Sequence, residues 1–196
     1  MMDVFSAAVT LFLTMDPLGN VPIFIAVLKK LDPKKRRRVL VRELFFSLAI
    51  LVGFLLIGEY ILRFLNLRQE TISIAGGIVL FLIALRMIFP PHEGILGDIP
   101  DGEPFIVPLA IPLVAGPSAL ATILLLARSE PGRLAEWLLA VLVAWIVSAA
   151  ILLFSGVFYR VFRQRGLIAM ERLMGMILVM VSVQMFLDGV AGYMRR

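Results

Sequence analysis

The sequence contains no cysteine and only one histidine in 196 residues. The absence of cysteine excludes disulfide scaffolds, thiol catalysis, iron–sulfur clusters and cysteine-based zinc sites. Charge is also scarce, because Asp, Glu, Lys and Arg make up 17% of the chain, against about 25% in a typical soluble domain. Apolar residues make up 61%, and the mean hydropathy is +0.99. A soluble fold of this length has too little interior to bury that much hydrocarbon, so the composition predicts an integral membrane protein.

The basic residues are concentrated in one stretch of a chain whose formal net charge is +5. Eight of the 19 lysines and arginines lie between residues 29 and 42, between two long apolar segments. A nucleic-acid-binding surface would carry interleaved aromatic side chains or a folded basic face. A short basic loop between apolar segments is instead typical of the cytoplasmic side of a membrane protein. We therefore predict no nucleic-acid partner and a cytoplasmic first loop.

Six apolar segments each approach the roughly 20 residues that a helix needs to cross a bilayer. Their hydrophobicity is continuous, which favours helices over the alternating strands of a membrane barrel. The segments are approximately Val4–Leu28, Leu44–Leu65, Thr71–Phe89, Phe105–Ala127, Leu134–Tyr159 and Leu173–Val190. The N-terminus has neither a basic region nor a small-residue cleavage site, so the first segment is expected to be a retained span. Twelve basic residues on the side of the first loop, against six on the other side, predict that both termini lie outside.

An internal repeat divides the predicted single transmembrane domain, residues 1–196, into two halves. The pattern P-L-x-x-x-P begins at Pro17 and again at Pro112, 95 residues later. A second match relates Gly77 to Gly175 at a spacing of 98. Repeat 1 is expected at about 1–89 and repeat 2 at about 104–196, joined by an acidic cytoplasmic loop at 90–103. Because each repeat holds three spans, the halves are predicted to have opposite topologies, as in many secondary transporters.

The repeated motif predicts that the first and fourth spans are broken near the middle of the bilayer. Its prolines, which lack a backbone donor and clash with the preceding turn, are Pro17 and Pro22 in one half and Pro112 and Pro117 in the other. Such prolines often only kink a membrane helix. Paired breaks at corresponding positions, one beside the intramembrane carboxylate of Asp16, favour a transport site.

The residues at these breaks indicate the class of ligand. A helix that restarts within the bilayer presents unpaired N–H groups, which favour an anionic group such as a carboxylate. Asn20 is expected to cap one restarting helix, and Gly116 or Ser118 the other. Asp16 could bind an ammonium group, a proton or a cation. Together these features describe a small zwitterion, hence an amino acid. The candidate substrate-binding residues are Asp16, Gly19, Asn20, Ala115, Gly116, Ser118 and Gln184.

Other charged residues receive structural interpretations. Glu59 is expected to pair with Arg63, four residues along the same helix. Arg42 and Glu43 are expected to mark the start of the second span. Gln184 and Asp188 lie four residues apart on one face of the sixth span, Gln184 toward the site and Asp188 toward the outer end.

Three segments resemble the signatures of the MarC family. They are Met15–Phe24, Pro104–Pro117, and Glu171–Gly175 together with Gln184–Gly189. The resemblance covers nearly the whole chain and is strongest to a bacterial inner-membrane branch of the family. It implies a six-span inner-membrane protein grouped with transporters of small neutral amino acids such as glycine and alanine.

The expected fold is therefore an all-α membrane protein of six helices in two inverted repeats. We expect a secondary transporter of a small neutral amino acid, coupled to H⁺ or Na⁺, in the bacterial inner membrane. The chain lacks the H-E-x-x-H and G-x-S-x-G patterns, so we predict no enzyme activity, no cofactor and no metal site. The alternatives are a membrane scaffold or regulatory protein, and a transporter or exporter of another small solute or cation. Homo-oligomerisation stays open.

Overall fold

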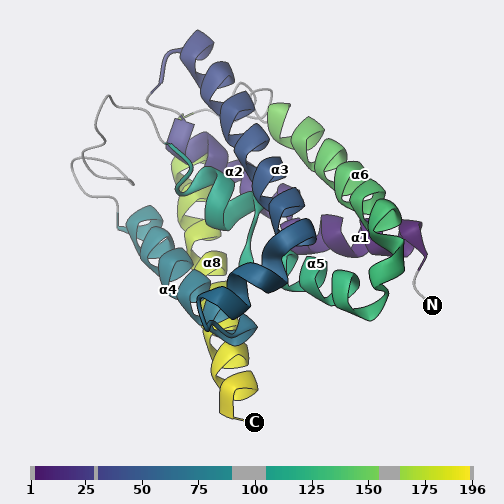
Figure 1. Ribbon diagram of the computed structural model, residues 1–196. Helices are drawn as coiled ribbons and strands as arrows, with labels where there is room; N and C mark the ends of the chain where they lie inside the picture. The colour runs from purple at the N-terminus through teal and green to yellow at the C-terminus, as the bar shows by residue number, and fades with distance from the viewer. Residues whose placement is uncertain (1–2, 29–30, 90–104, 155–163, 195–196) are drawn as a thin grey trace.

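A computed structural model describes residues 3–28, 31–89, 105–154 and 164–194. This part of the chain is helical, and its only β-type pairing is an isolated bridge between Phe105 and Val107. The elements (Figure 1) are α1 (Val4–Met15), α2 (Pro17–Leu28), α3 (Pro33–Phe64), α4 (Gln69–Ile88), the π-helix η2 (Leu109–Val114), α5 (Pro117–Ser129), the 3-10 turn η3 (Pro131–Arg133), α6 (Leu134–Leu153) and α8 (Gln164–Met194). The predicted loop at 90–103 and the end of the fifth predicted span lie outside the described residues.

Five helical segments in the described ranges are long and apolar enough to cross a membrane. They are Val4–Leu28, which contains the break between α1 and α2, and Lys34–Phe64, Glu70–Ile88, Pro131–Leu153 and Arg172–Met194. The all-α membrane class predicted from composition is thereby confirmed. Both α3 and α8 begin about ten residues before the apolar segments predicted for them, because helical hydrogen bonding continues beyond the apolar stretch.

The fourth predicted span, Phe105–Ala127, is not a continuous helix. Its first part is the short π-helix η2, in which Ile111 has extended dihedrals, and its second part is α5. With 13 residues, α5 reaches only about 20 Å, less than the roughly 30 Å of a hydrocarbon core. Prolines at 108, 112 and 117 remove backbone donors along this segment, which prevents one uninterrupted α-helix. This segment is therefore interrupted near its prolines, as the repeated motif predicts, and α5 alone is too short to cross the hydrocarbon core.

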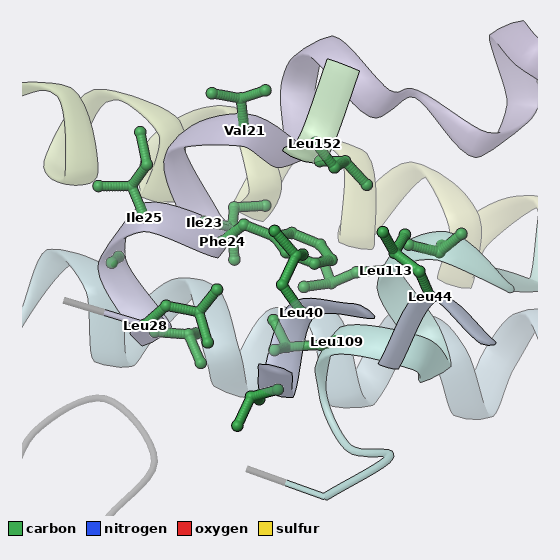
Figure 2. Packing of buried hydrophobic residues seen from close by; sticks show 14 of the residues in the cluster. Val21, Ile23, Phe24, Ile25, Leu28, Leu40, Leu44, Leu109, Leu113 and Leu152 are labelled. Carbon is green, nitrogen blue, oxygen red and sulfur yellow. The ribbon is translucent and has the colours of Figure 1, made fainter. Parts of the chain in front are cut away.

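Two clusters of buried apolar side chains form the core. One lies where α2 packs with α3 and η2, and Figure 2 shows Phe24 beside Leu40, Leu44, Leu109 and Leu113. The other cluster joins α1, α5 and α6. Large apolar side chains also cover the outer faces of the helices, for example Leu56 at 54% and Phe5 at 75% exposure. Exposed hydrocarbon on this scale is what contact with lipid requires.

Helices α4 and α8 pack closely in antiparallel directions. A Cβ atom on Gly77 would lie 2.9 Å from the carbonyl oxygen of Ser182. A Cβ atom on Gly175 would lie 3.1 Å from the carbonyl oxygen of Ala84. The first distance is shorter than real Cβ atoms show and the second is tighter than most, so glycine at these positions lets the two backbones approach, as small residues do in membrane helix pairs.

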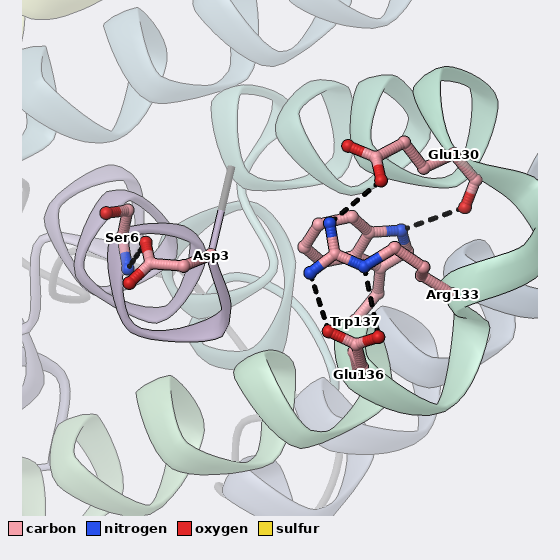
Figure 3. A network of polar contacts seen from close by, with 6 residues as sticks. All are labelled: Asp3, Ser6, Glu130, Arg133, Glu136 and Trp137. Atoms are coloured by element: carbon pink, nitrogen blue, oxygen red, sulfur yellow. Dashed lines mark hydrogen bonds and ion pairs between the residues drawn. The ribbon is translucent and has the colours of Figure 1, made fainter. Parts of the chain in front are cut away.

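Helix α1 of the first predicted repeat packs against α6 of the second. In the same way, α5 of the second predicted repeat packs against α3 of the first. The turn between α5 and α6 is held by Arg133, which contacts Glu130 at 2.8 Å and Glu136 at 2.6 Å (Figure 3). The Arg133 guanidinium also stacks 4.6 Å from the centre of the Trp137 ring. This charged cluster fixes the end of the molecule at which α5 turns back into α6.

Candidate transport site at two helix breaks

The first break lies at Asp16, immediately before Pro17 of the predicted break, whereas Pro22 of that motif lies inside α2. Asp16 has left-handed dihedrals, φ 43° and ψ 58°, which stop α1 at Met15. Aspartate tolerates this conformation better than most residues, and Pro17 suits the first position of the new helix because its φ is preset. The Asp16 carboxylate then caps α2, accepting a hydrogen bond of 3.1 Å from the backbone N–H of Gly19. A Cβ atom on Gly19 would clash with this carboxylate, so the cap requires glycine there.

The second break lies at Ala115 and Gly116. Gly116 is extended, with φ −76° and ψ 161°, and α5 restarts at Pro117. A Cβ atom on Gly116 would lie 2.7 Å from the carbonyl oxygen of Pro112, so the backbone has no room for a side chain at this point. The two breaks are not in the register of the repeated motif. The helix restarts at the first proline of the motif in repeat 1 and at the second proline in repeat 2.

The side chain of Asn20 joins the two breaks. Its Nδ2 donates hydrogen bonds of 2.9 Å to the carbonyl oxygen of Met15 and of 2.9 Å to that of Leu113, 93 residues away. Both carbonyls lack their usual helical partners. The N–H of Gly19, four residues after Met15, is committed to Asp16, and Pro117, four residues after Leu113, has no N–H. One buried carboxamide therefore satisfies an acceptor exposed by each break.

The structure changes the capping roles expected from the sequence. Asn20 lies inside α2 and does not cap it; Asp16 caps it instead. Gly116 is the N-cap residue of α5, as expected, and contributes no side-chain hydrogen bond. In the first turn of α5 the N–H groups of Ser118 and Ala119 precede the first helical bond, which Leu120 donates to Gly116. These two groups have no acceptor within α5.

The other predicted residues are distributed around this pair of breaks. Ala115 and Gly116 are buried, Gly19 is half-buried, and Asp16 and Ser118 are exposed. Gln184 is exposed on α8, where its amide donates a hydrogen bond of 2.8 Å to Asp188. This hydrogen bond stays within α8 and involves neither break.

A cavity of about 340 Å³ borders the second break. It lies between α4 and the η2–α5 segment, and its lining is almost entirely apolar, with Thr71 supplying a hydroxyl group. Other lining residues are Ala75, Gly76, Ile111, Pro112, Ala115 and Pro117. Gly76 faces the ring of Pro117, and a Cβ atom there would overlap that ring. The second break therefore borders a cavity, and neither Asp16 nor Asn20 lines that cavity.

Sequence reasoning missed the burial of Glu43. This residue was expected to mark the entrance of the second span, but its side chain is fully buried and bonded through Oε1 to Arg42. One signal was available: Glu43 is the only acidic residue between Asp32 and Glu59. Within the described ranges, no three His, Asp or Glu side chains gather as a metal site would require.

Comparison with known proteins matches residues 1–194 to the model of the MarC family of integral membrane proteins. The inner membrane protein YhgN of Escherichia coli K12 is 54% identical over 196 residues, covering all of both chains. A membrane protein of Buchnera aphidicola subsp. Schizaphis graminum is 51% identical over 195 residues, again covering all of both chains. A membrane protein of Chlamydia pneumoniae is 32% identical over 194 residues, covering 97% of this chain and 95% of its own. No solved structure matches. The chain belongs to the MarC family of integral membrane proteins.

Proposed function

We propose that this multi-pass inner-membrane protein is a secondary transporter of a small neutral amino acid such as glycine or alanine. The observation that carries the proposal is the junction made by Asn20, which holds two interrupted helices together inside an apolar protein. Broken backbone at membrane depth persists only where protein or a watery cavity surrounds it. Two such breaks side by side are the arrangement that transporters use to bind solutes.

The proposal includes two inverted repeats, and the contacts between α4 and α8 support it. Gly77 meets Ser182 and Met185, while Gly175 meets Ala84 and Met87. Adding 98 to the numbers of Gly77, Ala84 and Met87 gives Gly175, Ser182 and Met185. Each contact in one set therefore has its counterpart in the other. Such reciprocity is the property of an interface with two-fold symmetry, in which the same patch is used on both sides. The antiparallel directions of α4 and α8 agree with opposite membrane topologies for the two halves.

The chemistry of the breaks supports an amino acid as the substrate. The N–H groups of Ser118 and Ala119 at the start of α5, which have no acceptor within that helix, suit a carboxylate. Asp16 uses one carboxylate oxygen to cap α2, and its second oxygen suits an ammonium group. We propose coupling to H⁺ or Na⁺, with both termini outside, and no enzymatic role.

Uptake and counterflow of radiolabelled glycine and alanine in proteoliposomes test this function. The test variant is Asp16→Asn, which keeps the size of the side chain and removes its charge. The matched control is Asp3→Asn, because Asp3 also caps a helix, accepting a 3.0 Å hydrogen bond from the N–H of Ser6. Asparagine caps helices about as well as aspartate, so both variants should fold.

We expect saturable flux in the wild type and in Asp3→Asn, and at least tenfold slower flux in Asp16→Asn, because an amide cannot pair with an ammonium group. Normal flux in Asp16→Asn would show that the Asp16 carboxylate does not bind the substrate. The absence of amino-acid flux in folded wild-type protein under any ion gradient would favour another solute or the scaffold alternative.

A further inference from the structure

Glu43, on α3, is a buried carboxyl group for which the proposed function assigns no role. Its side chain has no exposed surface. Both Nε and Nη2 of Arg42 contact the same carboxylate oxygen, Oε1, at 3.0 Å. The other oxygen, Oε2, is buried and has no hydrogen-bond partner among the described residues. A buried carboxylate oxygen without a partner is costly, which points to a ligand that binds this atom.

Apart from Arg42, the described elements around Glu43 bring no charged group that could neutralise its carboxylate. Residues 105–108, η2 and α2 contain no titratable side chain. The backbone of Ile106 approaches the carboxyl group without completing a hydrogen bond to Oε2. From α6 comes Trp145, whose indole N–H donates to the carbonyl oxygen of Leu44 at 3.0 Å and to Oγ of Ser47 at 3.2 Å. These donors and acceptors are already engaged with one another.

The charged residues of the other helices packed on α3 are engaged elsewhere. Arg128 of α5 pairs with Glu59, at the far end of α3. Glu136 of α6 pairs with Arg133 in the α5–α6 turn. Arg42 is therefore the charged group that faces Glu43 among the described residues.

A proton fits this environment better than a metal ion. Sodium-sized and larger cations take several oxygen ligands, whereas Oε2 is a single free oxygen atom. A proton needs only one lone pair and removes the charge that makes burial unfavourable. We propose that Glu43 binds and releases the proton that couples solute movement to the pH gradient. This inference rests on the proposed transport function and names its coupling ion.

The packing provides a route between proton binding and the helix breaks. Leu44, the neighbour of Glu43, packs in the same cluster as Leu109 and Leu113 of η2 (Figure 2). The carbonyl of Leu113 is the acceptor that Asn20 holds at the second break. A rearrangement of η2 would therefore change both the packing beside Glu43 and the geometry of the second break.

Phe105 closes the Glu43 site on the side of Arg42. Its ring lies 5.1 Å from the Arg42 guanidinium and 5.3 Å, edge to face, from the ring of Phe46. The Arg42 side chain is 32% exposed and follows the basic residues 34–38 on α3, so we take it to meet water beside the buried carboxyl. In one conformation a proton from this water adds to the carboxylate to form a neutral carboxyl group. In the alternate conformation the same proton returns to water, with no other bond made or broken.

The test compares Glu43→Gln with wild type in proteoliposomes with the membrane potential clamped at zero. Glutamine keeps the shape of the side chain but cannot exchange a proton. For one proton per solute, a gradient of about one pH unit should drive about tenfold accumulation. We expect this accumulation in wild type, and none in Glu43→Gln, which should retain counterflow exchange of labelled glycine. The matched control is Glu59→Gln, on the same helix, whose carboxylate is 35% exposed and already paired with two arginines.

Infrared spectroscopy of the purified proteins gives a readout that does not depend on transport. The carbonyl band of a protonated carboxyl group should be present in wild type and in Glu59→Gln, and lost in Glu43→Gln. Persistence of that band in Glu43→Gln, or full pH-driven accumulation by this variant, would overturn the inference. Accumulation driven by sodium alone would also overturn it while leaving the transport function standing. Absence of counterflow in wild type would contradict the transport function. Even then, loss of the infrared band in Glu43→Gln would assign the bound proton to Glu43.

Discussion

Removing the carboxamide of Asn20 should destabilise the protein more than the loss of any exposed amide. Asn20 is 6% exposed and donates two hydrogen bonds of 2.9 Å. In Asn20→Ala the carbonyls of Met15 and Leu113 lose these bonds, and the helices offer no replacement donor. Each unsatisfied buried carbonyl costs about 1–3 kcal/mol in soluble proteins, while a side-chain hydrogen bond between membrane helices averages about 0.6 kcal/mol. We expect a loss of about 2 kcal/mol in the free energy of unfolding.

Unfolding by SDS in mixed micelles, followed by tryptophan fluorescence, measures this loss. Trp137 is fully buried beside α1 and α5, so its emission reports the state of the core. The control is Gln184→Ala, which removes an exposed amide bonded to Asp188 within one helix and should change the free energy by less than about 0.5 kcal/mol.

A second variant separates hydrogen bonding from packing. Asn20→Asp has nearly the same shape, but an ionised carboxylate has no donor and would face two carbonyl oxygens. We expect it to be at least as unstable as Asn20→Ala. Stability within about 0.5 kcal/mol of wild type for both variants would refute the conclusion that Asn20 holds the breaks together.

Two glycine substitutions test the close approaches. Gly116→Leu should abolish amino-acid flux in proteoliposomes, because a Cβ atom there would lie 2.7 Å from the carbonyl oxygen of Pro112 and displace the second break. Gly77→Leu should lower the free energy of unfolding by about 1–3 kcal/mol, measured in SDS titrations, since any side chain pushes α4 away from the backbone of α8 at Ser182.

The same substitution at two open positions provides the controls. A Cβ atom on Gly53 of α3 or Gly132 of η3 meets no heavy atom within 4 Å. Flux and stability near wild type in Gly53→Leu and Gly132→Leu would attribute the effects to the close approaches. Equal losses in the controls would show that leucine is harmful wherever it is introduced and would refute the packing argument.

Much of the fold was predictable because hydropathy and proline act locally. The apolar segments follow from the length that helices need in a bilayer. The break at Asp16 follows from an aspartate before a proline within such a segment, since both residues oppose a continuous helix. The fourth span was harder, because its apolar composition resembles that of the others while closely spaced prolines decide its backbone. Its division into η2 and α5 depends on which freed carbonyls find donors elsewhere.

The candidate site was predictable in its residue types and less so in their roles. Asp16 and Asn20 both favour helix caps, and the sequence does not say which one performs that task. The structure assigns the cap to Asp16 because the left-handed turn folds its carboxylate over Gly19. The burial of Glu43 was missed because a charged residue at the end of a basic stretch ordinarily faces water.

By itself, the sequence determined that the chain lies in a membrane, where its apolar segments fall, and that the first and fourth of them are interrupted near their prolines. These properties depend on composition and on neighbours within a few residues. Only the tertiary structure decided that Asn20 reaches Leu113 and that Glu43 is enclosed. Both facts arise when segments distant in the chain pack together. Whether a buried polar group finds a hydrogen-bond partner then depends on which donors those distant segments bring. A local sequence pattern does not specify those donors.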